Sequence, residues 1–271
     1  MALTRNVSVM SSHSTPDHVR DPLDVFRLDG RVAVVTGASA GLGAHFARVL
    51  HGAGATVVVA ARRLDRLTAL VDELPGTLAI QADLARADDR EHLIERTVAE
   101  VGAPRILVNN AGVGYKVPVE AEELDWFREV MEVNVTAIWH LSKLCAPHMI
   151  EGGSGNIVNI ASMFGMVGAS PVKQAHYCAS KGAVINLSRE LGLQWARKGI
   201  RVNALCPGWF PSEMTAAMDD EASMDFVRTM SPIPRLGELR ELDGALLLLA
   251  SDAASFMVGS SVVVDGGWTA R

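Results

Sequence analysis

The chain has 271 residues, of which 49% are hydrophobic and 21% are charged, a balance typical of a folded globular protein. Its 25 Lys and Arg residues against 31 Asp and Glu residues give a net charge of -6, and no basic block is present that would neutralise a phosphate backbone. These numbers argue against nucleic acid as a partner and favour a chain that buries its own core.

The first residues of the chain and its cysteines indicate the cellular compartment of the protein. The first 22 residues are polar, without the long apolar run of a signal peptide or a membrane span, and residues 1–27 are predicted to form a flexible leader. Cys145, Cys178 and Cys206 are scattered and odd in number, and the eight histidines show no ligand-like grouping. We therefore expect a cytoplasmic protein that has no metal site and is not bound to a membrane.

Seven short runs rich in β-branched residues recur along the chain, with longer helical stretches between them. Several runs are apolar at nearly every position, as expected for strands that helices cover on both faces. The alternation predicts an α/β fold with a doubly wound parallel sheet. The predicted strands are residues 32–36, 56–60, 78–81, 106–109, 157–160, 200–205 and 261–264.

A glycine-rich segment, Thr-Gly-Ala-Ser-Ala-Gly-Leu-Gly at residues 36–43, joins the first predicted strand to a helix. Gly37 and Gly41 permit a tight turn and close approach of the backbone to a phosphate, and Gly43 lets helix pack on strand. The amides at the start of the helix attract the anion. A dinucleotide pyrophosphate fits such a turn, while a turn that binds no ligand is the alternative.

Two apolar stripes at helical spacing lie in the second half of the chain. One follows Leu124, Phe127, Met131, Val135 and Ile138, and the other follows Val184, Leu187, Leu191 and Trp195. Core packing is the simpler interpretation of both stripes, and a subunit interface is the alternative.

Tyr177 and Lys181 lie four residues apart at the start of the second stripe, which places phenol and ammonium on one helix face. A nearby cation stabilises a phenolate and lowers the pKa of tyrosine below its ordinary value of ~10. The pair predicts a proton-transfer site, although this spacing also arises by chance on solvated helices.

These motifs resemble those of the short-chain dehydrogenase/reductase family, in the branch that includes 3-oxoacyl reductase and gluconate 5-dehydrogenase-like members. The resemblance covers residues 30–267 and implies a Rossmann fold with a seven-stranded sheet in the order 3-2-1-4-5-6-7. It also implies a dinucleotide-binding catalytic domain over residues 28–271 and a homotetramer. The stretch from Pro207 to Pro234 is rich in proline and methionine, and we expect a substrate flap around residues 209–234. The further matching landmarks are Asn109 to Gly112, Asn134, Ser162, Pro207-Gly208 and Asp265 to Gly267.

The resemblance implies a nicotinamide cofactor, and NADP(H) is favoured over NAD(H). Ala61 stands where NAD-using members usually have an acidic residue, and Arg62 and Arg63 follow it. Ala40 departs from the basic residue of many NADP-using relatives, which leaves use of both cofactors open. The expected cofactor-binding residues are Gly37, Ser39, Ala40, Gly41, Leu42, Gly43, Arg62, Arg63, Asp83, Leu84, Asn110, Ala111, Gly112, Tyr177, Lys181, Pro207, Gly208 and Ser212.

For the chemistry, the resemblance implies hydride transfer between nicotinamide and a ketone or secondary alcohol, with Tyr177 as the general acid or base. It assigns Ser162 to the substrate oxygen, Lys181 to the cofactor ribose and the tyrosine pKa, and Asn134 to a water relay. Individually, Ser162 could instead cap a strand end, Asn134 could satisfy helix backbone groups, and Asn110 could stabilise a turn.

The sequence indicates the substrate less clearly than the reaction, and two other functions remain open. Met163, Phe164, His176 and Trp209 are expected to contact the substrate, with Phe210, Met214 and Met218 nearby. Most of them are apolar and suggest a ketone or secondary alcohol with hydrophobic surface, whereas Lys116, Lys173 and His176 would suit a sugar acid or other anion. The alternatives are a catalytically silent nucleotide sensor and a nucleotide-sugar epimerase or dehydratase, although the glycine spacing and chain length argue against the latter.

Overall fold

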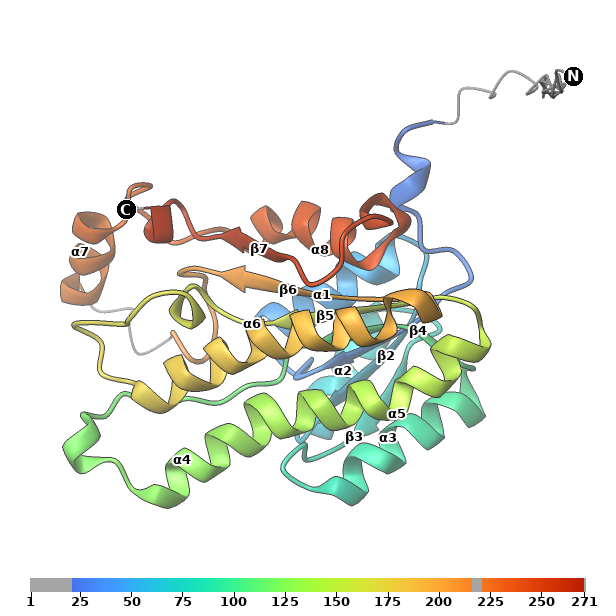
Figure 1. The fold of residues 1–271 in the computed structure, drawn as a ribbon, viewed down its shortest axis with the longest axis horizontal. Helices are drawn as coiled ribbons and strands as arrows, with labels where there is room; N and C mark the ends of the chain where they lie inside the picture. Colours follow the sequence, from blue (N-terminus) through green and yellow to red (C-terminus); the bar gives the residue numbers. More distant parts are fainter. Residues whose placement is uncertain (1–20, 216–220, 271) are drawn as a thin grey trace, which may run out of the picture.

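The computed structural model describes residues 21–215 and 221–270. Most of the expected leader and flap residue Met218 lie outside these ranges, and within 21–27 the chain forms the short 3-10 helix η1 (Asp24–Phe26). Figure 1 shows a central sheet running across the molecule with helices on both of its faces.

The sheet contains seven parallel strands in the order β3-β2-β1-β4-β5-β6-β7, so the expected topology is confirmed. Every predicted strand is present, and four of them extend beyond the predicted range by one to two residues at an end. The strands are β1 (Val32–Thr36), β2 (Thr56–Ala61), β3 (Leu78–Gln81), β4 (Pro104–Asn109), β5 (Gly155–Ile160), β6 (Ile200–Pro207) and β7 (Ser261–Val264).

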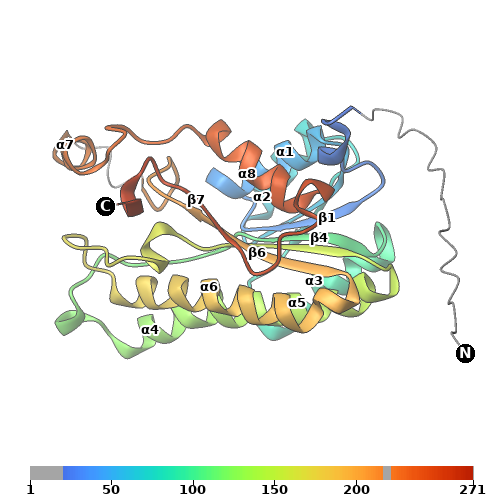
Figure 2. The same cartoon turned by 45° about the horizontal axis from the view of Figure 1, so that its top comes forward.

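Two layers of helices cover the sheet, one on each face (Figure 2). Helices α1 (Gly41–Gly52), α2 (Leu64–Glu73) and α8 (Asp243–Ala250) lie on one face. The other face carries α3 (Ala87–Glu100), α4 (Leu124–Met131), α5 (Ala137–Glu151) and α6 (Ala175–Trp195). The helix α7 (Glu221–Met230) lies at the end of the molecule beyond the sheet.

Alternating residues of one strand enter the two cores, which explains why the strands are apolar throughout. In β1, Ala33 and Val35 pack against α1 and α8, whereas Val34 packs against the helices of the other face, and all three are fully buried. Because all strands are parallel, their carboxyl ends meet along one edge of the sheet, where ligands bind in open α/β folds.

Some helical stripes are less buried than simple core packing would require. Val184 and Leu191 of α6 are buried, but Leu124 and Phe127 of α4 are exposed. No helix in the described residues is long and apolar enough to cross a membrane.

Candidate active site

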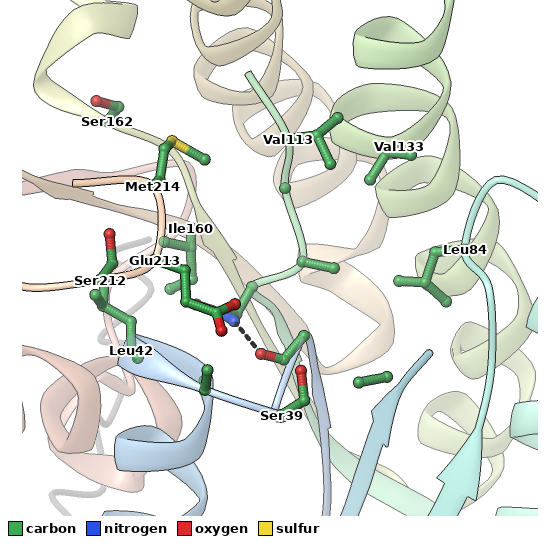
Figure 3. A pocket seen from close by; sticks show the side chains of 18 of the residues that line it. Ser39, Leu42, Leu84, Val113, Val133, Ile160, Ser162, Ser212, Glu213 and Met214 are labelled. Atoms are coloured by element: carbon green, nitrogen blue, oxygen red, sulfur yellow. Dashed lines mark hydrogen bonds between the residues drawn. The ribbon is translucent and has the colours of Figure 1, made fainter. Parts of the chain in front are cut away.

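A cavity of about 340 Å³ lies along the carboxyl ends of the strands and reaches from the glycine turn to Tyr177 and Lys181. Figure 3 shows Ser39 and Ser162 at opposite ends of this cavity, with Glu213 between them. Every residue expected to bind the cofactor lines it. Asn134 lies just outside the lining, behind Gly112.

Close backbone packing gives the glycine turn its shape. Gly37 and Gly41 adopt positive φ angles of 66° and 51°, which favour glycine. A Cβ on Gly43 would overlap the Gly37 carbonyl oxygen, so any larger residue would push the start of α1 away from β1. The turn therefore needs glycine for its own geometry as well as for the approach of a ligand.

Polar contacts tie this turn to the end of the neighbouring strand β4. The Thr36 Oγ1 accepts hydrogen bonds from the Asn110 and Ala111 amides at 3.0 and 3.1 Å. The Asn110 side chain donates to the Thr36 carbonyl at 2.9 Å and to the Gly37 carbonyl at 3.3 Å. These bonds fix two chain segments that both line the cavity.

At the other end of the cavity, α6 brings Tyr177 and Lys181 beside Ser162. The Lys181 Nζ lies 5.5 Å from the centroid of the Tyr177 ring and donates to the Ile160 carbonyl at 2.7 Å. Ser162 accepts from the Phe164 amide at 3.2 Å, and its side chain also hydrogen-bonds with Tyr177. The predicted acid, cation and hydroxyl groups thus lie at one site.

Asn134 is fully buried and lies in a turn of π-helix, η3 (Glu132–Thr136), between α4 and α5. Its Oδ1 accepts from the Val113 amide at 2.8 Å, while its Nδ2 donates to the Val113 carbonyl and the Ser180 hydroxyl. A Cβ on Gly112 would lie 3.3 Å from Asn134 Oδ1 and 3.5 Å from Lys181 Nζ. Asn134 and Lys181 therefore flank the same glycine, and a π-turn at such a place is common at functional sites.

Burial changes the pKa values of both titratable groups of the site. It raises the pKa of Tyr177 to about 12, although the side chain keeps an edge on the cavity, and the hydrogen bond with Ser162 opposes this rise. Burial also lowers the pKa of Lys181 to about 8. At neutral pH the site therefore holds a protonated phenol beside an ammonium group.

The end of the cavity far from Tyr177 carries charge from two segments. Arg62 and Arg63 follow β2, and Asp83 and the buried Leu84 follow β3. Asp83 accepts from the Ala85 amide at 3.1 Å, so it also caps a turn, as its position after a strand suggests. These residues could contact the adenosine part of a dinucleotide.

The residues expected to contact the substrate are placed differently from the expectation. Met163, Phe164 and Trp209 are buried in an aromatic cluster, with 5.4 Å between the Phe164 and Trp209 rings. Trp268, from the end of the chain, completes the cluster. These side chains shape the wall behind the site and do not line the cavity, because they pack against one another.

His176 also lies away from the cavity, fully buried under the loop that follows β4. Its Nε2 accepts from the Tyr115 amide at 2.9 Å, and its Nδ1 lies 2.5 Å from Glu122 Oε1. The same loop carries Gly114, where a Cβ would lie 2.7 Å from the Tyr177 ring. His176 thus anchors the loop that packs on Tyr177, a role that sequence position alone did not reveal.

Two acidic residues of the cavity, Glu129 and Glu213, were not predicted. Glu129 accepts from the Tyr115 hydroxyl at 2.6 Å, and Glu213 pairs with Arg63 and Arg66. No local motif marks either residue, because each reaches the cavity only through the packing of distant segments.

The residues present fit a nicotinamide dinucleotide. The glycine turn lies close against the end of β4, where a Cβ at Gly37 would lie 2.8 Å from Ala111 Cα, and both segments line the cavity. The amides at the start of α1 suit a pyrophosphate, and arginines lie at one end of the cavity with a proton donor at the other. Among the described residues, no group of histidine, cysteine and acidic side chains could hold a metal ion.

Comparisons with known proteins agree with this geometry. Residues 37–269 match a family model described as enoyl-(acyl carrier protein) reductase. The chain is 38% identical to galactitol 2-dehydrogenase (L-tagatose-forming) of Cereibacter sphaeroides, covering 90% of this chain and 97% of the relative. It is 40% identical to cis-4-hydroxycyclohexanecarboxylate dehydrogenase of Sinomonas cyclohexanicum, covering 89% and 97%.

A solved structure is similarly close. The gluconate 5-dehydrogenase of Burkholderia cenocepacia J2315, in complex with NADP and tartrate, superposes with a TM-score of 0.87 and is 39% identical. The match covers 92% of this chain and 99% of that one.

Proposed function

This chain belongs to the short-chain dehydrogenase/reductase family and is an NAD(P)-dependent oxidoreductase, and we propose that its reacting site consists of Tyr177, Lys181, Ser162 and Asn134. The observation that carries the assignment is the meeting of these side chains at one end of a cavity whose other end is the glycine turn. When bound, the nicotinamide supplies or accepts the hydride. The chain's own residues manage the proton and the oxygen of the substrate.

In the direction of reduction, Tyr177 donates its phenolic proton to the substrate oxygen as negative charge develops there. Ser162 hydrogen-bonds the same oxygen and holds it against the tyrosine. Because burial keeps the pKa of Tyr177 at about 12, the phenol is protonated at neutral pH and ready to act as an acid. In oxidation the phenolate is the base.

Lys181 and Asn134 assist this proton transfer without contacting the substrate oxygen. The ammonium of Lys181 stabilises the phenolate that reduction leaves behind. Asn134 and Lys181 both lie beside the Cβ position of Gly112, which supports a relay through water that returns a proton to the site. Asn134 acts as a positioning residue for that water, held by its bonds to Val113 and Ser180.

For the cofactor, we propose that NADP(H) is favoured and that NAD(H) is also accepted. Arg62 and Arg63 line the cavity next to the end of β2, where a guanidinium can pair with a 2′-phosphate. The solved relative with 39% identity was crystallised with NADP. Ala40 stands where many NADP-using relatives have a basic residue, and Ala61 stands where NAD-using relatives usually have an acidic one. Because the chain lacks both groups, we expect the preference for NADP(H) to be moderate.

For the substrate, we propose a secondary alcohol or ketone that also carries a carboxylate. An open groove of about 480 Å³ has an apolar floor that includes Val172 and Phe226. These two residues pack in the same cluster as Tyr177. Lys116 and Lys173 border the groove, and neither has an acidic partner within ion-pair distance among the described residues. A substrate carboxylate in the groove would form ion pairs with these lysines.

The names of the relatives support the same class. Cis-4-hydroxycyclohexanecarboxylate carries a secondary alcohol on an apolar ring together with a carboxylate, and gluconate is a polyhydroxy acid. Galactitol has no carboxylate, so relatives of comparable identity differ in this feature.

We also infer a cytoplasmic homotetramer. Leu124 and Phe127 of α4, Trp139 of α5 and Leu193 of α6 are exposed on neighbouring helices of one layer, which supports subunit contacts there. The three cysteines are free, as is usual in a reducing compartment. Light scattering at working concentration is expected to give four chains, and a stable monomer would contradict the inference.

The experiment that tests the function is a substrate screen of the purified full chain with both NADPH and NADH. We expect net oxidation of the reduced cofactor by keto acids, and weaker turnover of the corresponding neutral ketones. Cofactor binding without turnover across the panel would instead support a nucleotide sensor. Isomerisation of a nucleotide sugar without net cofactor consumption would support an epimerase.

A further inference from the structure

Glu213, in the segment after β6, reaches across the cavity to the arginine that follows β2. Arg63 Nη1 and Nη2 donate to the two carboxylate oxygens of Glu213 at 2.8 and 2.7 Å. Arg66 Nη1 donates to the same carboxylate at 2.6 Å. Figure 3 shows the Glu213 side chain pointing toward Ser39 at the glycine turn. The Glu213 carboxylate thus binds two arginines, Arg66 in α2 and Arg63 at the N-cap of α2.

Arg63 also binds the glycine turn. Its Nε and Nη2 approach the Ser39 hydroxyl at 3.3 and 2.8 Å. The guanidinium is therefore held flat between the glycine turn and Glu213. A 2′-phosphate that binds Arg63 in the same bidentate manner would have to take the place of the Glu213 carboxylate, because both anions need the same pair of nitrogen donors.

Glu213 also supplies a group that the end of β2 lacks. The residue there is Ala61, so no carboxylate from β2 can accept a hydrogen bond from a ribose hydroxyl. The neighbouring arginine holds the pKa of Glu213 below its ordinary value, so the group is ionised at neutral pH. An ionised carboxylate accepts a hydrogen bond from a 2′-hydroxyl and repels a 2′-phosphate.

We propose that Glu213 is a specificity-determining residue that sets the balance between the two nicotinamide cofactors. It competes with the 2′-phosphate for Arg63, and it accepts a hydrogen bond from the 2′-hydroxyl where no phosphate is present. This inference rests on the proposed function, since it concerns the adenosine end of the same cavity.

The expected effect is moderate. Arg63 and Glu213 are 40% and 53% exposed, so solvent screens the pair and a phosphate can displace the carboxylate. Removing the charge in a Glu213→Gln variant should raise affinity for a 2′-phosphorylated nucleotide about two- to fivefold, the range given by an exposed ion pair. Affinity for the unphosphorylated nucleotide should fall in Glu213→Ala, which has no acceptor for the 2′-hydroxyl, and fall less in Glu213→Gln, whose amide oxygen still accepts.

The test is calorimetric titration of the full-length protein with adenosine 2′,5′-bisphosphate and with 5′-AMP. Wild type, Glu213→Gln and Glu213→Ala are compared, and thermal unfolding checks that each variant is folded. Glu73→Gln is the matched control, because Glu73 pairs with Arg48 at 2.6 Å with a similar exposure but lies outside the cavity. It should bind both probes as wild type does.

An Arg63→Met background shows whether the effect passes through this arginine. There, Glu213→Gln should give no gain for the bisphosphate, because the contested donors are gone. Equal affinities of wild type and both Glu213 variants for the bisphosphate would overturn the inference, as would a full gain in the Arg63→Met background. A wild-type protein that binds neither probe would overturn the proposed function itself.

Discussion

The two ends of the active-site cavity are built in different ways. The nucleotide end depends on backbone: Gly37 and Gly43 pack so tightly that a Cβ at either position would overlap neighbouring atoms, and Asn110 ties their turn to β4. The substrate end depends on side chains, such as the edge-to-face packing of Phe164 and Trp209. The first kind of region tolerates little change of sequence, whereas the second can be repacked.

This difference is consistent with one fold that serves many substrates with one class of cofactor, the nicotinamide dinucleotides. Close contacts between main-chain atoms leave only glycine at defined spacings, so the nucleotide end keeps its shape. An aromatic wall accepts other large residues if the total volume is kept. The groove beside Lys116 and Lys173 is open, so its shape depends on few contacts.

The largest expected effect is on turnover, from a change at Tyr177, where the nucleotide end and the substrate end of the cavity meet. Tyr177→Phe removes the proton donor and keeps the ring, so we expect turnover to fall about a thousandfold or more. Binding of NADPH should be nearly unchanged, because the glycine turn and the arginines are intact. Steady-state rates and a fluorescence titration of NADPH measure the two quantities. Turnover near the wild-type level would contradict the assignment of Tyr177.

The next prediction tests how rigid the nucleotide end is. Gly43→Ala places a methyl group against the Gly37 carbonyl oxygen, and we expect the KM for NADPH to rise about 10- to 100-fold, from an overpacking cost of about 1–3 kcal/mol. Gly52→Ala, at the other end of α1, is the control, because its Cβ would meet no atom within 4 Å. If the two variants have the same KM, the turn is less constrained than its geometry indicates.

Most of the nucleotide end could be predicted from the sequence, whereas much of the substrate end could not. All seven strands followed from apolar runs. Their order and the residues that line the nucleotide end followed from the family resemblance, which rests on short motifs such as the glycine turn. Glu213 was missed, because it meets Arg63 across 150 positions of the chain. His176 was misplaced, because its burial depends on Tyr115 and Glu122, which belong to a loop without a recognisable pattern.

The titration of the reacting groups gives a third prediction, which concerns direction. With the pKa of Tyr177 raised to about 12, only a small fraction is phenolate at neutral pH, so alcohol oxidation should rise with pH. We expect kcat/KM for oxidation to increase about tenfold per pH unit on the acid side of the Lys181 pKa of about 8. Above that value the rise should level off, as the ammonium that stabilises the phenolate loses its proton.

Reduction should behave differently over the same range. The phenol remains protonated throughout, so kcat/KM for a ketone should stay nearly flat until Lys181 titrates. Profiles in both directions with one substrate pair make the comparison. An oxidation rate that is independent of pH would show that the phenol is not the titrating base.

The smallest expected effect lies at the open substrate groove. Lys116→Gln and Lys173→Gln each remove one cation that has no acidic partner among the described residues, and we expect each to raise the KM for a carboxylate substrate about two- to fivefold, as for an exposed ion pair. The kcat should change little, because neither lysine touches the reacting groups. Lys198→Gln, in the short helix η5 (Ala196–Lys198), removes the same charge outside the groove and is the control.

A neutral ketone of the same size separates charge recognition from packing. Its KM should be the same for wild type and both groove variants, because no carboxylate is present to be recognised. If both variants also weaken the neutral ketone, the lysines act through the shape of the loops that carry them, which the bond from the Val117 amide to the Lys173 carbonyl joins at 2.8 Å. In that case the substrate end would be as dependent on backbone as the nucleotide end, and the contrast between them would narrow.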